Sequence, residues 1–379
     1  MQLIRPIRAQ DIDALIEIAD ISGPGFTSLP LHAELLEQKI AQSIESMQQP
    51  LSRPQGEHYL FVLEDTESGA VIGTTAIASA VGMNDPWYHY RIGTMVHASR
   101  AMNIHNCFRT LYLCNDYTGH SEVCSLFLHP QYRGSKNRGT SSVRQKSQVA
   151  QRTTEQPNGY SGTLLSKSRL LFMAQFPDRF AERVIAEMRG VSTEPGISPF
   201  WEGLGRHFFT MEFSEADYLT GLGNKSFIAE LMPKHSIYIH LLPESAQQVI
   251  GEVHSNTRPA RKMLEDEGFH FEGYVDIFDA GPTLVSRLKD LRTVRHSQLY
   301  PVQIQVKEAG LNVADSTVEQ CLLANTGLQQ YRCLVDMIHV PDEGHPLLLS
   351  QQLAETLLLQ SGDSVRMVPL ALTRKRPLG

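Results

Sequence analysis

Short apolar runs alternate with segments of helical periodicity over the first 290 residues, which predicts a mixed α+β fold. One apolar run covers residues 123–128 and stops before Pro130, because proline cannot donate to a strand ladder. Gly159 and Gly162 come later and lead into apolar positions at helical spacing over residues 164–176. The pattern predicts a buried strand, a turn, and then an amphipathic helix.

This order of elements is typical of a site that binds an anion. Backbone N–H groups at a helix start can bind phosphate, and glycine lets the ligand approach closely. The candidate phosphate-binding residues are Arg133, Gly134, Gly159 and Gly162. An ordinary flexible connection is the alternative, and the flanking strand and helix make us favour a phosphate-bearing ligand.

Other segments follow the same alternation. The pattern predicts strands at residues 2–8, 59–64, 71–78, 111–115, 183–190, 271–279 and 283–286. Residues 257–269 are expected to form a helix, with Pro259 in its first turn and Gly268 just past its end. Residues 84–91 are rich in aromatic and hydrogen-bonding groups, and either a pocket lining or a packed loop accounts for them.

Two polar stretches divide the chain. Residues 134–157 are basic and lack an apolar period, so we expect a disordered insert, with a basic lid over phosphates as the less favoured alternative. Residues 289–300 are expected to be a linker. The predicted units are a catalytic domain at 1–288 and a small β-rich, barrel-like domain at 301–379.

Composition narrows the class of protein. The chain has 379 residues, 41% of them hydrophobic and 20% charged, which favours a globular protein. The formal charge of −7 gives no basic footprint for nucleic acid. Five scattered cysteines form no disulfide or zinc pattern. We find no signal peptide and no membrane-spanning run, and therefore expect a cytoplasmic protein.

The first 290 residues resemble the GNAT acyltransferase fold, a mixed sheet flanked by helices. The matching segments are IRPIRAQDIDAL, FVLEDTESGAVIG, the strand, turn and helix described above, and ARKMLEDEGF. In that superfamily the turn before the helix holds the pyrophosphate of an acyl-CoA. The resemblance therefore implies that acyl-CoA is the phosphate-bearing ligand.

Longer segments resemble one family, the arginine N-succinyltransferases. They are FTSLP, NDPWYHYRIGTMVHAS, LLSKSR, AEMRG, SPFW, FIAELMPKH and VDIFDAGPT. The resemblance implies transfer of succinyl from succinyl-CoA to the α-amine of L-arginine, as the first step of arginine catabolism by the succinyltransferase route. An enzyme acting on ornithine or another amino acid is one alternative, and a non-catalytic acyl-CoA-binding subunit is another.

The same resemblance assigns two roles. In the segment GEVHSNTRPA it implies that His254 is the proton donor, and in CSLFL it implies that Leu126 meets succinyl-CoA through its backbone. A histidine that titrates near neutrality suits this task, and backbone N–H groups can stabilise a thioester oxyanion. A capping or surface position is the alternative for His254.

Arginine needs carboxylates for its guanidinium and a cation for its α-carboxylate. The candidates, chosen by residue type and position, are Asp85, Asp116, Glu122 and Glu187 for the guanidinium, and Arg91 and Arg189 for the carboxylate. We expect no metal and no permanently bound cofactor, with succinyl-CoA as co-substrate. A homo-oligomer and a hetero-oligomer with a related subunit both stay open. The chain departs from the family in its insert, which separates Arg133 from LLSKSR, and in the GxxG spacing of Gly159 and Gly162.

Overall fold

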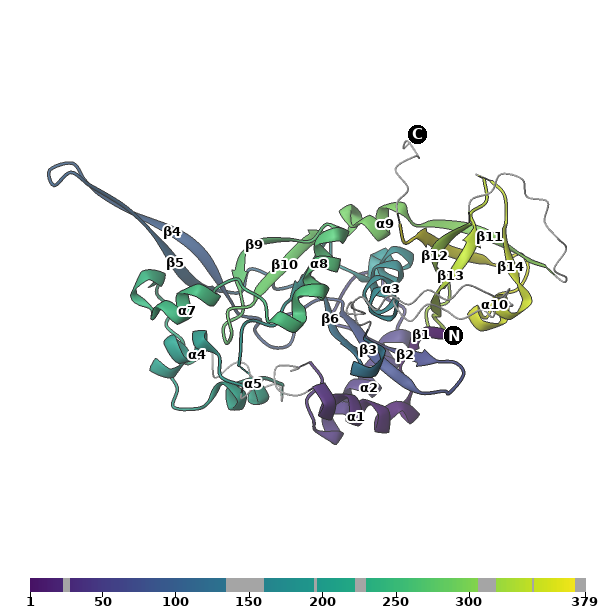
Figure 1. Ribbon diagram of the computed structural model, residues 1–379, viewed down its shortest axis with the longest axis horizontal. Coiled ribbons are helices and arrows are strands. Elements are labelled where there is room, and N and C mark those ends of the chain that lie inside the picture. Colours follow the sequence, from purple (N-terminus) through teal and green to yellow (C-terminus); the bar gives the residue numbers. More distant parts are fainter. Residues whose placement is uncertain are drawn as a thin grey trace, which may run out of the picture.

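The chain is an α+β protein built on one long sheet (Figure 1). The computed structural model describes residues 1–22, 28–133, 160–193, 196–221, 230–305, 318–342 and 344–371. Within these ranges 15 strands join in the order β14-β11-β15-β12-β13-β1-β2-β3-β6-β7-β10-β9-β4-β5-β8. The α+β class expected from the sequence is confirmed. None of the described helices is both long enough and apolar enough to cross a membrane.

The element bounds show where the predicted pattern holds. The strands are β1 Gln2–Pro6, β2 His58–Asp65, β3 Val71–Ala78, β4 His89–Ser99, β5 Ile104–Cys114, β6 Ser121–Leu128, β7 Arg183–Glu187, β8 Ile237–Tyr238, β9 His270–Val275, β10 Pro282–Arg287, β11 Gln298–Gln305, β12 Val318–Asn325, β13 Cys333–His339, β14 Leu347–Ser350 and β15 Ser364–Pro369. The helices are α1 Ile12–Ser22, α2 Ala33–Gln48, α3 Ser161–Gln175, α4 Pro199–Gly203, α5 Phe213–Gly221, α7 Glu244–Val249, α8 Arg258–Glu267, α9 Arg292–His296 and α10 Gln351–Leu357.

Helices cover both faces of the central strands. On β2 the side chains alternate, so that Phe61 packs in the core cluster that contains α3 and Leu60 packs in the cluster that contains α1 and α2. Figure 1 shows α1 and α2 on one side of β2 and β3, with α3 on the other. Helix α8 begins and ends as predicted, since Pro259 lies in its first turn and Gly268 follows it with φ of 109°.

Helix α3 differs from its sequence prediction. We expected an amphipathic helix with a polar face in solvent, but Lys167, Ser168 and Arg169 are as well buried as the apolar positions. Helices α8 and α9 and strands β12 and β13 cover the face that the sequence pattern leaves to water. The prediction failed because these covering elements come from more than 80 residues later in the chain.

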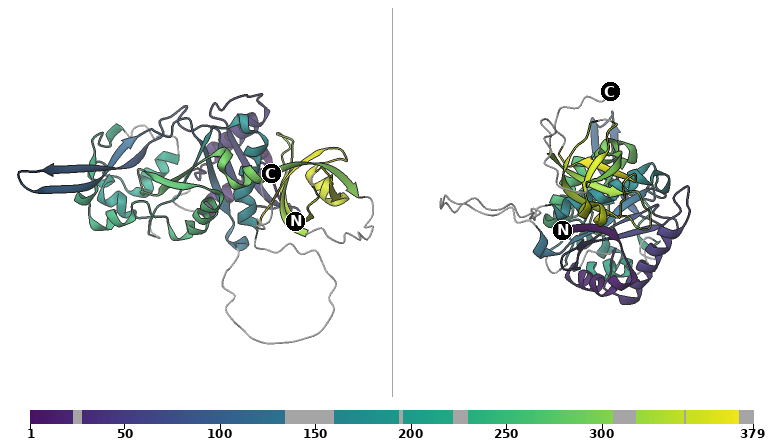
Figure 2. Two further views of the ribbon diagram at one scale, coloured as in Figure 1. Left: turned by 90° about the horizontal axis from the view of Figure 1, so that it is seen from above. Right: turned by 90° about the vertical axis from the view of Figure 1, so that its right-hand side faces the viewer.

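The last strands extend the sheet beyond β1. Ile4 of β1 pairs with Cys333 of β13, and Leu3 packs into the separate core formed by β11–β15 and α10. Residues 289–300, predicted to be a linker, include α9 and the start of β11. The view from above in Figure 2 shows these strands at one end of the molecule. The division into two domains stays a prediction.

The opposite end of the molecule is a long hairpin arm made by β4 and β5. These strands pair from His89 opposite Cys114 to Ser99 opposite Ile104. At its base β4 pairs with β9 through Tyr90 and Arg91. Beyond the base the ribbon projects away from the body in Figures 1 and 2. The sequence analysis predicted only residues 111–115 of this arm as a strand.

Candidate active site between the central strands

Strands β6 and β7 run parallel in the middle of the sheet but pair over a short length. Ser121 lies opposite Val184, and Glu122 lies opposite Ile185. Strand β6 continues to Leu128, yet its later residues have no described partner in β7. We call this separation of the two strands the splay. Its backbone groups on β6 are free of strand pairing to β7, so they can bind a ligand instead.

A β-bulge lies in β6 at the splay. The pairing of β3 with β6 shifts between Thr74 and Ala76, and Ser125 has φ of 51°. A left-handed backbone costs a non-glycine residue roughly 1–2 kcal/mol, and such strain is found at functional sites. Ser125 Oγ is buried and has no well-aligned hydrogen-bond partner among the described residues, although the Cys124 thiol lies close to it.

The register of β6 and β7 relates the two residues that the sequence analysis assigned to catalysis. Leu126 on β6 and Arg189, two residues past the end of β7, both come after the last paired residues of the two strands, Glu122 and Ile185. The carbonyl oxygen of Arg189 accepts a hydrogen bond of 2.9 Å from the backbone N–H of His254. Leu126 and His254 therefore belong to opposite sides of the same splay, although 128 positions separate them in the sequence.

Asp279 organises the turn that carries Arg189. Its carboxylate accepts hydrogen bonds from Gly190 N at 2.6 Å and from Gly281 N at 2.8 Å. Both positions must be glycine for the backbones to pack this closely. A Cβ on Gly190 would lie 2.4 Å from Asp279 O, and one on Gly281 would lie 2.0 Å from Met188 O. The close packing of these backbones fixes the position of Arg189 and, through it, of His254.

The ring of His254 is oriented by its own backbone turn. Nδ1 accepts a hydrogen bond of 3.2 Å from Asn256 N, so the proton of the neutral imidazole is on Nε2. Partial burial, together with the positive charge of Arg189, lowers the pKa of His254 below its usual value of 6.5. The imidazole is therefore mostly neutral at pH 7 and can first accept a proton and later return it.

The structure describes part of the predicted phosphate-binding site. Arg133 donates from Nε to Leu128 O at 2.7 Å, and its guanidinium lies 5.4 Å from the centre of the Phe127 ring. These contacts hold Arg133 at the end of β6, and burial lowers its pKa. Gly162 is in the first turn of α3, and a Cβ there would meet no atom within 4 Å. Gly134, Gly159 and the predicted insert at 134–157 lie outside the described residues.

Glu187, at the end of β7, is surrounded by residues from the aromatic segment 84–91. Trp87 Nε1 donates to Glu187 Oε1 at 2.8 Å, and His89 Nε2 lies 2.8 Å from the same oxygen without the alignment of a hydrogen bond. Asp276 is half-buried nearby, and desolvation followed by the charge of Glu187 raises its pKa. Tyr90 packs in an aromatic core. The segment therefore contributes both to the candidate site and to the core.

Arg91 and Asp116 form a second polar group at the base of the arm. Their closest charged atoms are 3.7 Å apart, and Tyr274 Oη donates to Asp116 Oδ2 at 2.8 Å. Burial and the neighbouring Asp116 raise the pKa of Tyr274 to about 12, so the phenol is protonated at pH 7. Both members of the ion pair are more than 40% exposed, which leaves them accessible to a ligand.

Of the three remaining candidates for arginine binding, two lie at the splay and one lies on an exposed loop. Glu122 is buried in the paired part of β6, where the splay begins. Arg189 donates from Nη2 to Ser192 Oγ at 3.0 Å, while its Nε is buried without a hydrogen-bond partner among the described residues. Asp85 is exposed on the loop before β4 and makes no described hydrogen bond or ion pair, so no contact brings it to the splay.

The sequence analysis missed three residues that organise this site: Asp279, Tyr274 and Arg169. Asp279 and Tyr274 are in or near the segment VDIFDAGPT, but nothing in that pattern shows which backbone or side chain they meet. Arg169 is in LLSKSR, where a charged residue between apolar positions was the available signal. In the part of the chain that the structure describes, no group of His, Cys, Asp or Glu side chains is arranged to hold a metal ion.

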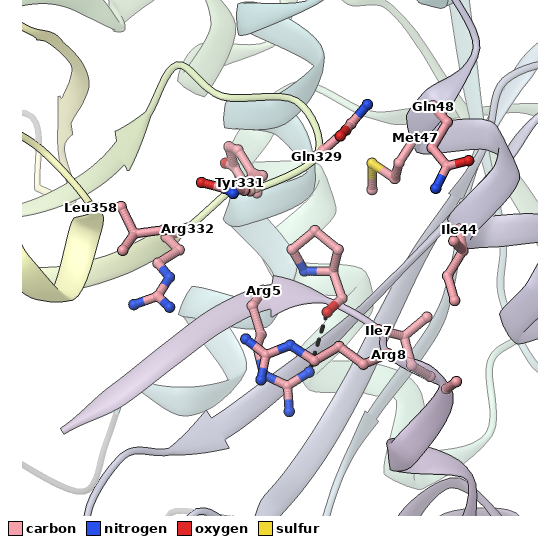
Figure 3. Close-up of a pocket in the computed structure, with 13 residues that line it drawn as sticks. Arg5, Ile7, Arg8, Ile44, Met47, Gln48, Gln329, Tyr331, Arg332 and Leu358 are labelled. Carbon is pink, nitrogen blue, oxygen red and sulfur yellow. Dashed lines mark hydrogen bonds between the residues drawn. The ribbon is translucent and has the colours of Figure 1, made fainter.

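A separate cavity of about 500 Å³ lies between β1, α2 and the loop before β13 (Figure 3). Arg5, Arg8 and Arg332 line its polar side, and Ile44 and Met47 are among its apolar residues. None of the residues predicted for catalysis or substrate binding lines this cavity. The candidate active site at the splay and this cavity are therefore separate.

Family models of known proteins match most of the chain. The family model described as arginine N-succinyltransferase beta subunit matches residues 2–147 and 147–293, and the model of that subunit's C-terminal domain matches residues 302–369. The first match is interrupted at residue 147, inside the predicted insert.

Individual relatives match over nearly the whole chain. The arginine N-succinyltransferase of Citrobacter koseri is 45% identical over 375 residues, and that of Escherichia coli O17:K52:H18 is 44% identical over the same length, each covering 99% of both chains. The solved structure of arginine/ornithine succinyltransferase subunit AI from Pseudomonas aeruginosa superposes with a TM-score of 0.83 at 35% identity, covering 98% of this chain and 99% of that one. The chain belongs to the arginine N-succinyltransferase family.

Proposed function

We propose that the protein transfers the succinyl group of succinyl-CoA to the α-amine of L-arginine, giving N2-succinyl-L-arginine and free CoA. The observation that carries the proposal is the splay, in which β6 continues through Leu126 without a partner in β7 while the carbonyl oxygen of Arg189, just past the end of β7, binds the backbone of His254. Acyl transfer needs an electrophilic carbonyl between hydrogen-bond donors and a proton-transfer group. Leu126 and His254 supply these two functions from opposite sides of the splay.

His254 would act first as a base. An α-ammonium group has a pKa of about 7.7–8.0, so it must lose one proton before nitrogen attacks the thioester. A histidine whose pKa is lowered by burial and by Arg189 is neutral at pH 7 and can take that proton. As the C–S bond breaks, the CoA sulfur receives a proton from the same imidazole. As the N–C bond forms and the C–S bond breaks, the nitrogen loses its second proton to water. One proton thus ends on CoA and one in solvent, and the histidine returns to its starting state.

The unpaired backbone of β6 would bind the thioester. A backbone N–H near Leu126 can donate to the thioester oxygen as negative charge develops on it. The strained backbone at Ser125 keeps this part of β6 out of the regular ladder. A parallel strand pair that separates at a bulge, followed by a helix, supports assignment of residues 1–288 to the GNAT fold. Arg133 and the start of α3 would then bind the pyrophosphate, with acyl-CoA as a co-substrate.

The acceptor amino acid would bind with its α-carboxylate on Arg189. The reacting amine and this carboxylate share one carbon atom, and Arg189 is adjacent to His254 through the backbone hydrogen bond. The orphaned Nε of Arg189 provides a donor for the carboxylate. Glu187 and Asp116 are the candidates for the distal cation of the side chain. The name of the relative from Pseudomonas aeruginosa includes ornithine, which makes ornithine the second candidate acceptor.

A thiol-release assay tests this function. We expect purified protein to release CoA from succinyl-CoA with L-arginine at a higher kcat/KM than with L-ornithine or L-lysine, and mass spectrometry should find the succinyl group on the α-nitrogen. A higher kcat/KM with L-ornithine than with L-arginine would identify ornithine as the preferred acceptor. Binding of CoA without thiol release for any of the amines would identify an acyl-CoA-binding subunit instead of an enzyme.

We also propose that the β4–β5 arm joins two copies of the chain. An isolated two-stranded hairpin is only marginally stable in water, yet residues 94–98 and 104–107 of this one are exposed throughout. Met95, Val96, Met102 and Ile104 are its large exposed apolar residues. Residues 92–114 contain two arginines and no Asp or Glu, so the arm carries +2 while the rest of the chain carries −9. The acidic body of a second copy is therefore the complementary partner.

Light scattering with a shortened arm tests this interface. The test variant joins Thr94 to its cross-strand partner Arg109 through Asn-Gly, a favoured two-residue hairpin turn. We expect the wild-type chain to be dimeric at micromolar concentration and the shortened chain to be monomeric with unchanged far-UV circular dichroism. A monomeric wild-type chain, or a shortened chain that stays dimeric, would contradict the assignment.

The domain division and the location are further parts of the proposal. The separate core of β11–β15 and α10 supports a C-terminal unit at residues 301–379, although residues 289–300 are partly helical and include the buried side chains of Leu291 and Thr293. The five cysteines are unpaired, as expected in a reducing compartment, which supports a cytoplasmic location.

A further inference from the structure

Arg169 is a buried cation in the middle of α3. Only 2% of its surface is exposed, and its guanidinium extends to β6, where Nη1 donates to Cys124 O at 3.4 Å. Its other hydrogen bonds go to Ser166 of its own helix, from Nε to the carbonyl oxygen at 3.2 Å and from Nη2 to Oγ at 3.4 Å. All of these acceptors are neutral.

In the described part of the chain, Arg169 has no ion-pair partner. No carboxylate there lies within 4.0 Å of its guanidinium, and Glu122 acts on it as a more distant negative charge. Burial lowers the pKa of Arg169 to about 10, so the group is still positively charged at pH 7. A buried charge without a partner is costly and is normally paired. Lys167, two residues earlier, shows the usual arrangement, since it forms an ion pair with Glu267.

The surroundings of Arg169 are those of the splay. Cys124 and Ser125 belong to the bulge in β6, and Leu126, the candidate residue for the thioester, is two positions from Cys124. Ser125, whose buried hydroxyl has no aligned partner in the described part of the chain, directly follows Cys124, whose carbonyl oxygen accepts from Arg169. The cation and this hydroxyl are thus both associated with the bulge next to the proposed acyl site.

We propose that Arg169, with Ser125, binds the terminal carboxylate of the succinyl group and so selects a dicarboxylic acyl-CoA. This inference rests on the proposed acyl transfer at the splay. The two carboxyl carbons of a succinyl group are joined through three C–C bonds of about 1.5 Å and lie about 4 Å apart. A hydrogen bond of about 3 Å at the carboxylate extends this reach to about 7 Å from the thioester carbon.

The matched substrate for a test is butyryl-CoA. Butyryl has the same four-carbon chain as succinyl but ends in a methyl group, so a comparison of the two measures recognition of the carboxylate alone. We expect wild-type protein to favour succinyl-CoA by about 100- to 1,000-fold in kcat/KM, because a site built for a polar group rejects an analogue that lacks it. Arg169→Met, which keeps the length of the side chain, should remove most of this preference and leave kcat/KM for butyryl-CoA within a few-fold.

Two further variants separate recognition from folding. Ser125→Ala should lower the succinyl-to-butyryl ratio by about 10-fold, as expected for the loss of one hydrogen bond to a charged group. Ser168→Ala is the matched control, since Ser168 is adjacent on α3, equally buried, and bonds through Oγ to Leu165 O of its own helix. Its ratio should equal that of the wild-type chain.

The outcome that overturns the assignment is a ratio that neither Arg169→Met nor Ser125→Ala changes, or a loss of equal size for both acyl-CoAs. That result would make Arg169 a structural support of the bulge. Failure of the proposed function is a different result, namely no thiol release by the wild-type chain with either acyl-CoA. In that case calorimetry still decides the inference: Arg169→Met should weaken succinyl-CoA binding and leave butyryl-CoA binding unchanged.

Discussion

Replacement of Asp279 by alanine should uncouple the two sides of the active site. Its carboxylate accepts hydrogen bonds from Gly190 N at 2.6 Å and Gly281 N at 2.8 Å, and it is 8% exposed. A hydrogen bond to a charged group contributes about 1.5–3 kcal/mol, so the two together amount to roughly 3–6 kcal/mol. Typical domains are stable by about 5–15 kcal/mol, so the variant should still fold at 25 °C but unfold at lower urea concentration.

The kinetic effect of Asp279→Ala follows from its neighbours. Gly190 is next to Arg189, whose carbonyl holds the backbone of His254 at 2.9 Å. A displacement of about 1 Å in a catalytic group lowers the rate by about 100-fold. We therefore expect kcat to fall by about that factor while the affinity for CoA, measured by calorimetry at 25 °C, changes little.

A control variant separates positioning from general destabilisation. Asp363→Ala removes a carboxylate that accepts a hydrogen bond of 2.7 Å from Gln360 N in the C-terminal strands, away from the splay. It should leave kcat unchanged. If Asp279→Ala lowers the free energy of unfolding yet keeps the wild-type kcat, the turn does not position His254 and the reasoning is refuted.

Three further predictions concern single groups. His254→Ala should lower kcat by about 100- to 10,000-fold with nearly unchanged CoA affinity, and an unchanged kcat would remove His254 from the mechanism. Because activity needs neutral His254 and its pKa is lowered, kcat/KM should fall with decreasing pH through a pKa below 6.5; Arg189→Gln removes the nearby positive charge and should move that limb to higher pH, which a pH–rate profile measures. Glu267→Ala leaves the buried Lys167 without its ion-pair partner and Thr293 N without its acceptor. Urea unfolding should therefore show a free energy of unfolding lower by about 3–5 kcal/mol, and a decrease below about 1 kcal/mol would contradict a buried ion pair.

Local patterns predicted the elements on which the site is built. The apolar run at residues 123–128 forms most of β6, and Pro259 and Gly268 mark the two ends of α8. These elements follow from interactions between residues close in sequence, such as capping and the termination of a ladder by proline. The same holds for the turn between β2 and β3, where Gly69 has φ of 72°.

Relations between distant segments could not be predicted in this way. The splay between β6 and β7 depends on pairing between strands about 60 residues apart. The burial of Arg169 could not be foreseen, because its neighbours in sequence do not show that β12, β13, α8 and α9 will cover helix α3. The bulge at Ser125 and the contacts of Asp279 are likewise products of tertiary packing.

The place of β1 in the sheet has a consequence for synthesis of the chain. One edge of Gln2–Pro6 pairs with β2, which leaves the ribosome soon afterwards, but the other edge pairs with β13 near Cys333. At about 5–20 residues per second, the nascent chain would keep that edge open for roughly 20–60 seconds. An open strand edge can pair with other chains. The nascent protein is thus most prone to aggregate while its C-terminal strands are still being made.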